Sequence, residues 1–345
     1  MFYNEPMDVI SVTNLRKRFN LEAGFFAPLG RFVYAVNGVS LAIGRNETYG
    51  LVGESGCGKT TTARLLVRMY EADEGEILFR GQNGDTVDVR KLKGPEFKRY
   101  RERVKYVFQD PARSLNPRMT VHEVLTSGAR WSDAASRPGG SRKAGLREEA
   151  GAILEEVGLS RADLDRRPAE FSGGQRQRIS IARGLIMKPD LLICDEVVSA
   201  LDVSIQGQIL NLLLDLRSRR ELSFLFIAHD LKVACYFCDR IGVMYRGEIM
   251  EEAPAADLWN KAIQQKGLHP YTELLFSSVR NGKESPPVLR GAAPSETPVS
   301  GALPNAAGGC AFASRCPHAE DRCLREKPEL RETGENHLVR CWIRY

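Results

Sequence analysis

The spacing of hydrophobic residues along the chain indicates buried strands. Short apolar runs fall within residues 8–52, where one strand lies inside 35–43 and another, over 47–52, leads into a glycine-rich segment. Continuous apolar runs at 191–194 and 223–228 predict parallel strands, because such strands are covered on both faces. These runs together predict a sheet whose middle strands are fully buried.

Apolar residues also recur at the three- and four-residue spacing of a helix. Predicted helices cover 60–70, 146–157, 171–186 and 204–217, and a further helix begins near Thr120. Since strands and helices share one chain in this way, we predict an α/β fold.

Two stretches show neither spacing. Residues 131–145 include Arg137-Pro138-Gly139-Gly140-Ser141 and predict a surface loop. Residues 281–309 are rich in Pro, Gly, Ser and Ala and predict an extended linker. We therefore expect a first domain over residues 1–265 and a C-terminal extension over 266–345.

Composition and charge narrow the possible classes of protein. The chain has 345 residues, which is too long for one simple core. Hydrophobic residues make up 43% and charged residues 27%, which is ordinary globular composition. A net charge of +5 is small for this length and indicates nucleic acid only weakly. No apolar run is long enough to span a bilayer and the start shows no secretory signal, so we expect a cytosolic protein. There, eight cysteines do not predict a disulfide framework.

The glycine-rich segment after residue 52 joins a predicted strand to a predicted helix, which is the context of a phosphate-binding loop. Its backbone N–H groups would surround a β-phosphate, and the helix start adds a favourable dipole. Lys59 would contact the β- and γ-phosphates, and the Thr60 hydroxyl would bind Mg²⁺. The predicted nucleotide-binding residues are Gly53, Glu54, Ser55, Gly56, Cys57, Gly58, Lys59, Thr60 and Thr61.

Two acids follow the predicted strand at 191–194. An acid at the carboxyl end of a parallel strand faces the ligand crevice, so Asp195 is predicted to hold Mg²⁺ through water. Glu196 is predicted to orient and deprotonate the attacking water. Taken alone, such a pair is also compatible with simple helix capping.

A second glycine segment, Ser172-Gly173-Gly174-Gln175, opens another predicted helix and forms a second anion site. One subunit cannot readily use both anion sites on one nucleotide. Here the sequence resembles the ABC ATPase family, whose signature segment has this pattern. The resemblance implies that two cassettes pair head to tail, so that each signature closes on the ATP in the other's phosphate loop. It implies a P-loop NTPase fold, with a RecA-like core, an antiparallel β subdomain and a helical subdomain at about 111–170.

The same resemblance assigns roles to other positions. Gln109 matches the glutamine that reaches Mg²⁺ and the water, and His229 matches the switch histidine that contacts the γ-phosphate. Residues 199–202 match the loop that crosses the dimer interface. The chain departs from the family at Val197-Val198, where a proline usually follows the acid pair. No catalytic group is lost there, so we predict a hydrolysing site.

An aromatic side chain is expected to stack on adenine. Phe19 occupies the position where the family places this ring. Because residues 20–31 resemble an insertion, Phe32 and Tyr34 remain alternatives.

Residues 110–120, which follow Gln109, and the tail that begins His269-Pro270-Tyr271-Thr272 resemble the oligopeptide/dipeptide importer branch. The resemblance implies a subunit on the cytoplasmic face of the inner membrane that powers uptake of peptides or a related solute. Its partners would be two membrane permease subunits, a second ABC ATPase subunit (a homologous chain or a copy of itself) and a solute-binding protein. The alternative is a soluble ABC ATPase that acts on nucleic acid or ribosomes; the segment 110–120 favours the importer.

Four cysteines lie in the last 36 residues, at Cys310, Cys316, Cys323 and Cys341. Four thiolates in a cytosolic tail can hold a metal. Structural zinc sites usually use closer pairs, and these wider gaps favour an iron–sulfur cluster, [4Fe-4S], which the importer branch is thought to carry there. Zn²⁺ and unmetallated cysteines remain open alternatives.

Overall fold

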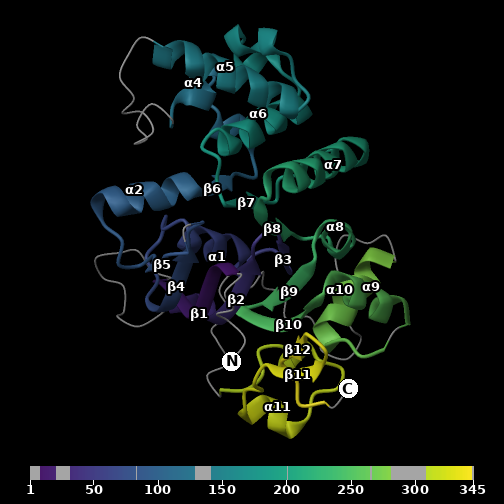
Figure 1. The fold of residues 1–345 in the computed structure, drawn as a ribbon. Helices are drawn as coiled ribbons and strands as arrows, with labels where there is room; N and C mark the ends of the chain where they lie inside the picture. The colour runs from purple at the N-terminus through teal and green to yellow at the C-terminus, as the bar shows by residue number, and fades with distance from the viewer. Residues whose placement is uncertain are drawn as a thin grey trace, which may run out of the picture.

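The computed structural model describes residues 8–20, 32–82, 84–128, 141–199, 201–264, 266–280 and 308–343, without the side chains of 141–144 and 278–280. A helical lobe lies above two sheets, and a small C-terminal lobe lies below them (Figure 1). Among the described residues, no helix combines the length and the apolar character needed to cross a membrane.

The larger sheet has eight strands in the order β11-β12-β10-β9-β3-β8-β7-β6. The five strands from β9 to β6 are parallel to one another, and β10, β12 and β11 continue the sheet in antiparallel pairing. The strands are β3 (Thr48–Val52), β6 (Val104–Val107), β7 (Leu191–Asp195), β8 (Ser223–Ala228), β9 (Arg240–Tyr245), β10 (Glu248–Pro254), β11 (Arg331–Gly334) and β12 (His337–Val339). Every residue of β7 and β8 is buried, which confirms the two strands predicted from continuous apolar runs.

The smaller sheet is antiparallel, in the order β2-β1-β4-β5. Its strands are β1 (Asp8–Asn20), β2 (Phe32–Gly44), β4 (Glu74–Arg80) and β5 (Thr86–Asp88). Asn37 of β2 joins the two sheets, because its backbone N–H donates to the Gly247 carbonyl at 2.8 Å and its side chain donates to Glu248 at 2.7 Å. The apolar face of this sheet packs against the first helix.

That helix, α1 (Lys59–Leu66), starts directly after the glycine-rich segment. It ends four residues before the predicted limit, because Arg68 adopts the left-handed conformation (φ 50°). The other helices of the core are α2 (Gly94–Arg103), α7 (Val203–Arg220), α8 (Leu231–Phe237), α9 (Ala255–Gln264) and α10 (Pro270–Arg280).

The helical lobe contains the short turn α3 (Pro111–Ser114) and three longer pieces, α4 (Val121–Thr126), α5 (Ser141–Glu156) and α6 (Gly173–Leu185), with 3₁₀ turns at Arg161–Asp165 and Pro168–Glu170. The helix expected near Thr120 is α4, which Thr120 caps together with Glu123. The loop predicted over 131–145 is wrong for its last residues, since α5 begins at Ser141. Residues 142–144, Arg-Lys-Ala, are strong helix formers and outweigh Gly145. Residues 131–140 lie outside the described residues.

The C-terminal lobe, residues 308–343, contains a 3₁₀ turn at Ala313–Arg315, helix α11 (Asp321–Arg325) and the last two strands. Its strand β12 pairs with β10, so the lobe continues the main sheet. Phe312 is fully buried, and its ring lies 5.3 Å from the rings of both Tyr245 and Tyr271. The predicted linker over 281–309 lies outside the described residues, except for 308 and 309.

Buried polar groups tie this lobe to the core. The Glu251 carboxylate accepts from His337 Nε2 at 2.7 Å and from the His269 backbone N–H at 3.0 Å. The His269 ring in turn accepts at Nδ1 from the Tyr271 N–H at 3.0 Å, at the start of α10. Burial lowers the pKa of His269 to about 4, so the ring is neutral in the folded protein.

We therefore expect folding stability to decrease as the pH falls from 6.5 to 4. The unfolded chain binds a proton at His269 near the usual pKa of about 6.5, whereas the folded chain does not until about pH 4. The linked loss is roughly 3 kcal/mol over this window. Urea unfolding at several pH values should show a smaller loss for His269→Asn, whose side-chain oxygen also accepts a hydrogen bond. Identical pH dependence in both proteins would exclude His269 as the cause.

Candidate nucleotide-binding site

The carboxyl ends of the parallel strands meet at one edge of the main sheet. In register, Val52 of β3 lies beside Ala228 of β8, and Asp195 of β7 lies beside Ile227. The residues that follow these strands therefore come together at this edge, as ligand-binding residues do in open parallel sheets. The sequence places Gly53, Asp195, Glu196 and His229 there, with Gln109 two residues beyond β6.

The glycine-rich loop closes around Lys59. The ammonium group of Lys59 donates to the carbonyl oxygens of Gly53 at 2.7 Å and Glu54 at 2.9 Å, and the side chain is buried. The Cys57 carbonyl accepts from the Gly247 N–H at 2.8 Å, which fixes the loop to the sheet below. Burial raises the pKa of the Cys57 thiol, so this side chain is a neutral filler beneath the loop.

Two glycines of the loop have different reasons to be glycine. At Gly58 (φ +112°) an added Cβ would lie 2.1 Å from the Ala35 carbonyl oxygen. At Gly56 (φ +78°) an added Cβ would meet open space, so only the backbone conformation disfavours a side chain.

The predicted magnesium ligands Thr60 and Asp195 lie together. The Thr60 hydroxyl donates to Asp195 Oδ1 at 3.0 Å. The other carboxylate oxygen accepts from the Tyr106 hydroxyl, whose pKa is raised by burial and by the charge of Asp195. Two such oxygen donors suit Mg²⁺, which takes its remaining ligands from water and phosphate. Tyr106 was not predicted as a site residue, because it lies within the strand β6 and its partner Asp195 is 89 residues away in sequence.

Glu196 and Gln109 also lie together, with Gln109 Nε2 donating to Glu196 Oε2 at 2.8 Å. Glu196 has a left-handed backbone (φ 49°), and its carbonyl accepts from the Ser199 hydroxyl at 2.9 Å. Val197 and Val198 are buried beneath this turn, where the family usually has a proline. Packing and the Ser199 hydrogen bond thus hold the turn that carries Glu196.

His229 and the aromatic candidates for adenine are less enclosed. His229 is exposed directly after β8. Phe19 is 38% exposed at the end of β1, edge-on to Tyr70 with ring centroids 5.4 Å apart. Phe32 and Tyr34 face each other across 5.6 Å on the neighbouring strand, and their register places all three rings at one end of the β1–β2 pair.

The segment predicted to be a second anion site lies at the start of α6 in the helical lobe, away from the loop that precedes α1 (Figure 1). Ser172 caps α6: its hydroxyl accepts from the Gln175 N–H at 3.3 Å, and the Gln175 side chain accepts from the Ser172 N–H at 2.9 Å. Ser172, Gly173 and Gln175 are exposed, while Gly174 lies against Ile205 of α7. Across the described ranges, no hydrogen bond joins this segment to the Lys59 loop. The two glycine-containing segments are therefore separate in one chain.

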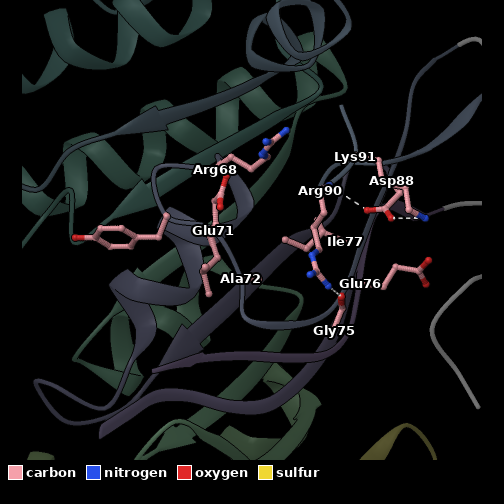
Figure 2. Close-up of a pocket in the computed structure, with 11 residues that line it drawn as sticks. Arg68, Glu71, Ala72, Gly75, Glu76, Ile77, Asp88, Arg90 and Lys91 are labelled. Atoms are coloured by element: carbon pink, nitrogen blue, oxygen red, sulfur yellow. Dashed lines mark hydrogen bonds and ion pairs between the residues drawn. The ribbon is translucent and has the colours of Figure 1, made fainter. Parts of the chain in front are cut away.

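A hollow of about 460 Å³ lies beside α1, β4 and β5 (Figure 2). Arg68 and Glu71 lie on one side of it, and Asp88, Arg90 and Lys91 on the other. Asp88 and Lys91 form an ion pair at 3.0 Å, and Arg90 donates to the Gly75 carbonyl. This hollow contains none of the predicted site residues.

Two of the four C-terminal cysteines are joined through the backbone, since the Cys310 N–H donates to the Cys323 carbonyl at 2.7 Å. Burial, with a smaller contribution from the charges of Cys323, Cys341 and Cys316, raises the pKa of Cys310 to about 11. In the ranges that the structure describes, however, no group of three or more His, Cys, Asp or Glu side chains is arranged to hold a metal. The predicted iron–sulfur or zinc site is therefore not confirmed.

Known proteins resemble the chain along almost its whole length. The ABC transporter family profile matches residues 36–199, and the profile "Oligopeptide/dipeptide transporter, C-terminal region" matches residues 250–323. The oligopeptide transport ATP-binding protein AppF of Bacillus subtilis is 41% identical over 97% of both chains. A Brucella ovis protein that carries the name "peptide import ATP-binding protein" is 42% identical over 96% of this chain and 97% of its own length.

The chain belongs to the family of ABC transporter ATP-binding proteins. Solved ABC cassettes share its fold. A dimeric cassette, MJ0796, bound to ADP and Pi, is 26% identical, covers 71% of this chain and 98% of its own, and has a TM-score of 0.59. The ADP form of the cassette MJ1267 has a TM-score of 0.62 at 24% identity over 79% of this chain and 99% of its own. These similarities confirm the predicted P-loop NTPase fold of this ABC cassette and its resemblance to the oligopeptide/dipeptide branch.

The different surroundings of Gly58 and Gly56 predict different losses of stability when each is replaced by alanine. Gly58→Ala should lower the free energy of unfolding by about 2–5 kcal/mol, because backbone strain and a steric clash add. Gly56→Ala should cost about 1–2 kcal/mol, from backbone strain alone. Urea unfolding without nucleotide measures both. Equal losses would show that the Ala35 contact does not constrain the loop.

Proposed function

We propose that this protein is the ATP-hydrolysing subunit of an ABC importer that takes up peptides or a related solute. The observation that carries the proposal is the pairing of Glu196 with Gln109 at the sheet edge where Thr60 meets Asp195. This places a candidate general base next to candidate ligands for Mg²⁺ and phosphate. The transport function rests on the names of relatives such as AppF and on the C-terminal family match.

In this proposal the residues of the loop from Gly53 to Thr61 bind the phosphates of ATP. Lys59 would exchange the Gly53 and Glu54 carbonyls for phosphate oxygens, while Thr60 and Asp195 would hold Mg²⁺. When bound, the metal neutralises charge that develops on the transferred phosphoryl group. Glu196 would accept a proton from the attacking water, and Gln109 would orient it.

We propose that a second ABC subunit completes each site. The exposed, capped segment Ser172-Gly173-Gly174-Gln175 would contact the nucleotide of its partner through the N–H groups of its two glycines and the positive end of α6. His229 would contact the γ-phosphate, and the ring of Phe19 or a neighbour would contact adenine. The separation of the two glycine-containing segments within one chain supports this arrangement.

The assembly would include two membrane permease subunits and a solute-binding protein, with this subunit on the cytoplasmic face of the inner membrane. We propose three functional parts: the domain 1–265, its helical subdomain at about 111–170, and the extension 266–345. The alternative, a soluble ABC ATPase acting on nucleic acid, has no support from the named peptide-import relatives.

Glu196→Gln should retain ATP binding and reduce turnover by about 100-fold or more, since the amide cannot accept the proton. The amide keeps an oxygen for the Gln109 hydrogen bond. Phosphate release by the assembled transporter measures turnover, and binding of labelled ATP tests occupancy.

Glu155→Gln is the matched control. Glu155 lies on α5, where it pairs with Arg161 at 2.9 Å, away from the sheet edge. Its turnover should match that of the unchanged protein. Wild-type turnover in Glu196→Gln would reject Glu196 as the base.

We propose further that Cys310, Cys316, Cys323 and Cys341 bind a metal, with [4Fe-4S] favoured over Zn²⁺. The backbone hydrogen bond from the Cys310 N–H to the Cys323 carbonyl, at 2.7 Å, brings two of these residues together and supports the proposal. Anaerobically purified protein should be brown and contain iron. Colourless protein with one zinc per chain would reject the cluster, and metal-free protein would reject both.

A further inference from the structure

The C-terminal lobe touches the phosphate-binding loop directly. The two terminal nitrogens of Arg315 donate to the two carboxylate oxygens of Glu54, at 2.8 and 2.9 Å, across 261 residues of sequence. A paired contact of this kind fixes the orientation of the carboxylate as well as its distance. The loop is thus tied to a segment that is remote in sequence.

Aromatic rings hold the Arg315 side chain in place. Its guanidinium lies 5.6 Å from the centre of the Tyr245 ring and 5.7 Å from that of Phe312. Tyr245 packs on Tyr271 with ring centroids 4.6 Å apart, and both rings pack on Phe312 at 5.3 Å. Since all three rings are buried, Arg315 extends from a rigid base.

Glu54 is held at three points. Its backbone N–H donates to the Tyr271 hydroxyl at 3.0 Å, its carbonyl accepts from Lys59 at 2.9 Å, and its carboxylate binds Arg315. Lys59 must release the carbonyl to reach a phosphate. The turn hydrogen bond from the Cys57 N–H to the Glu54 carbonyl, at 3.3 Å, and the contacts with Tyr271 and Arg315 then remain. Of these partners, Tyr271 and Arg315 are remote in sequence, and both belong to the C-terminal part of the chain.

The charge of Glu54 makes this contact important. Glu54 carries the one carboxylate in the segment 53–60, and unpaired it would offset Lys59 and repel a polyphosphate. We propose that Arg315 is a positioning residue of the nucleotide site, which neutralises Glu54 and holds its carboxylate against the C-terminal lobe. This inference rests on the proposed nucleotide site.

The test is calorimetric binding of MgATP and MgADP to the full chain. Arg315→Gln should raise the Kd for MgATP roughly tenfold, and that for MgADP less, because repulsion by Glu54 grows with phosphate charge. In the Glu54→Gln background, the same change at Arg315 should alter either Kd by less than about twofold. Arg315→Lys, which keeps the charge, should fall between the unchanged protein and Arg315→Gln.

Arg325→Gln is the matched control, because Arg325 is an exposed residue of the same lobe with its nearest carboxylate, Asp321, at 3.9 Å. It should leave both Kd values unchanged. The ratio of the Kd for MgATP to the Kd for MgADP does not depend on the fraction of folded protein. This ratio therefore tests the role of Arg315 even if Arg315→Gln is less stable. A wild-type ratio in Arg315→Gln, or an effect that persists without the Glu54 charge, would overturn the inference.

Lys59→Ala separates this inference from the proposed site. It should abolish MgATP binding. If Lys59→Ala still binds MgATP, the proposed nucleotide site is wrong. If Lys59→Ala loses MgATP binding but Arg315→Gln leaves both Kd values unchanged, only the role of Arg315 is wrong.

Discussion

The parallel register of five strands is the constraint on which the site depends. β6, β7, β8, β3 and β9 run in one direction, so the segments after them leave the sheet at the same edge. The Thr60–Asp195 hydrogen bond joins the segment after β3 to the end of β7, and the Gln109–Glu196 hydrogen bond joins the segment after β6 to that same end of β7. A strand shifted by one residue would turn its functional side chain to the wrong face.

The start of α6, at Ser172, is held by local contacts instead. Ser172 and Gln175 satisfy each other's backbone N–H groups, so the start of α6 is well formed although it is exposed. Gly174 fits closely against Ile205, which fixes α6 to α7. Contacts within one chain thus define the start of α6.

Local patterns predicted much of this structure. β8 has the predicted bounds, because a strand covered on both faces requires a continuous apolar run. The capped starts of α4 and α6 are also visible in sequence. The early end of α1 was not, since the left-handed Arg68 follows from tertiary packing. Tyr106 and Arg315 were not predicted for a similar reason, because each contacts a partner that is far away in sequence.

Because Arg315 and Glu54 are far apart in sequence, they are made at different times during synthesis. The ribosome makes the phosphate-binding loop 261 residues before its ionic partner, and it makes β10 before the strand β12 that pairs with it. During synthesis the Glu54 carboxylate therefore lacks the Arg315 guanidinium until the C-terminal lobe has been made. A chain that stops before residue 308 lacks that partner.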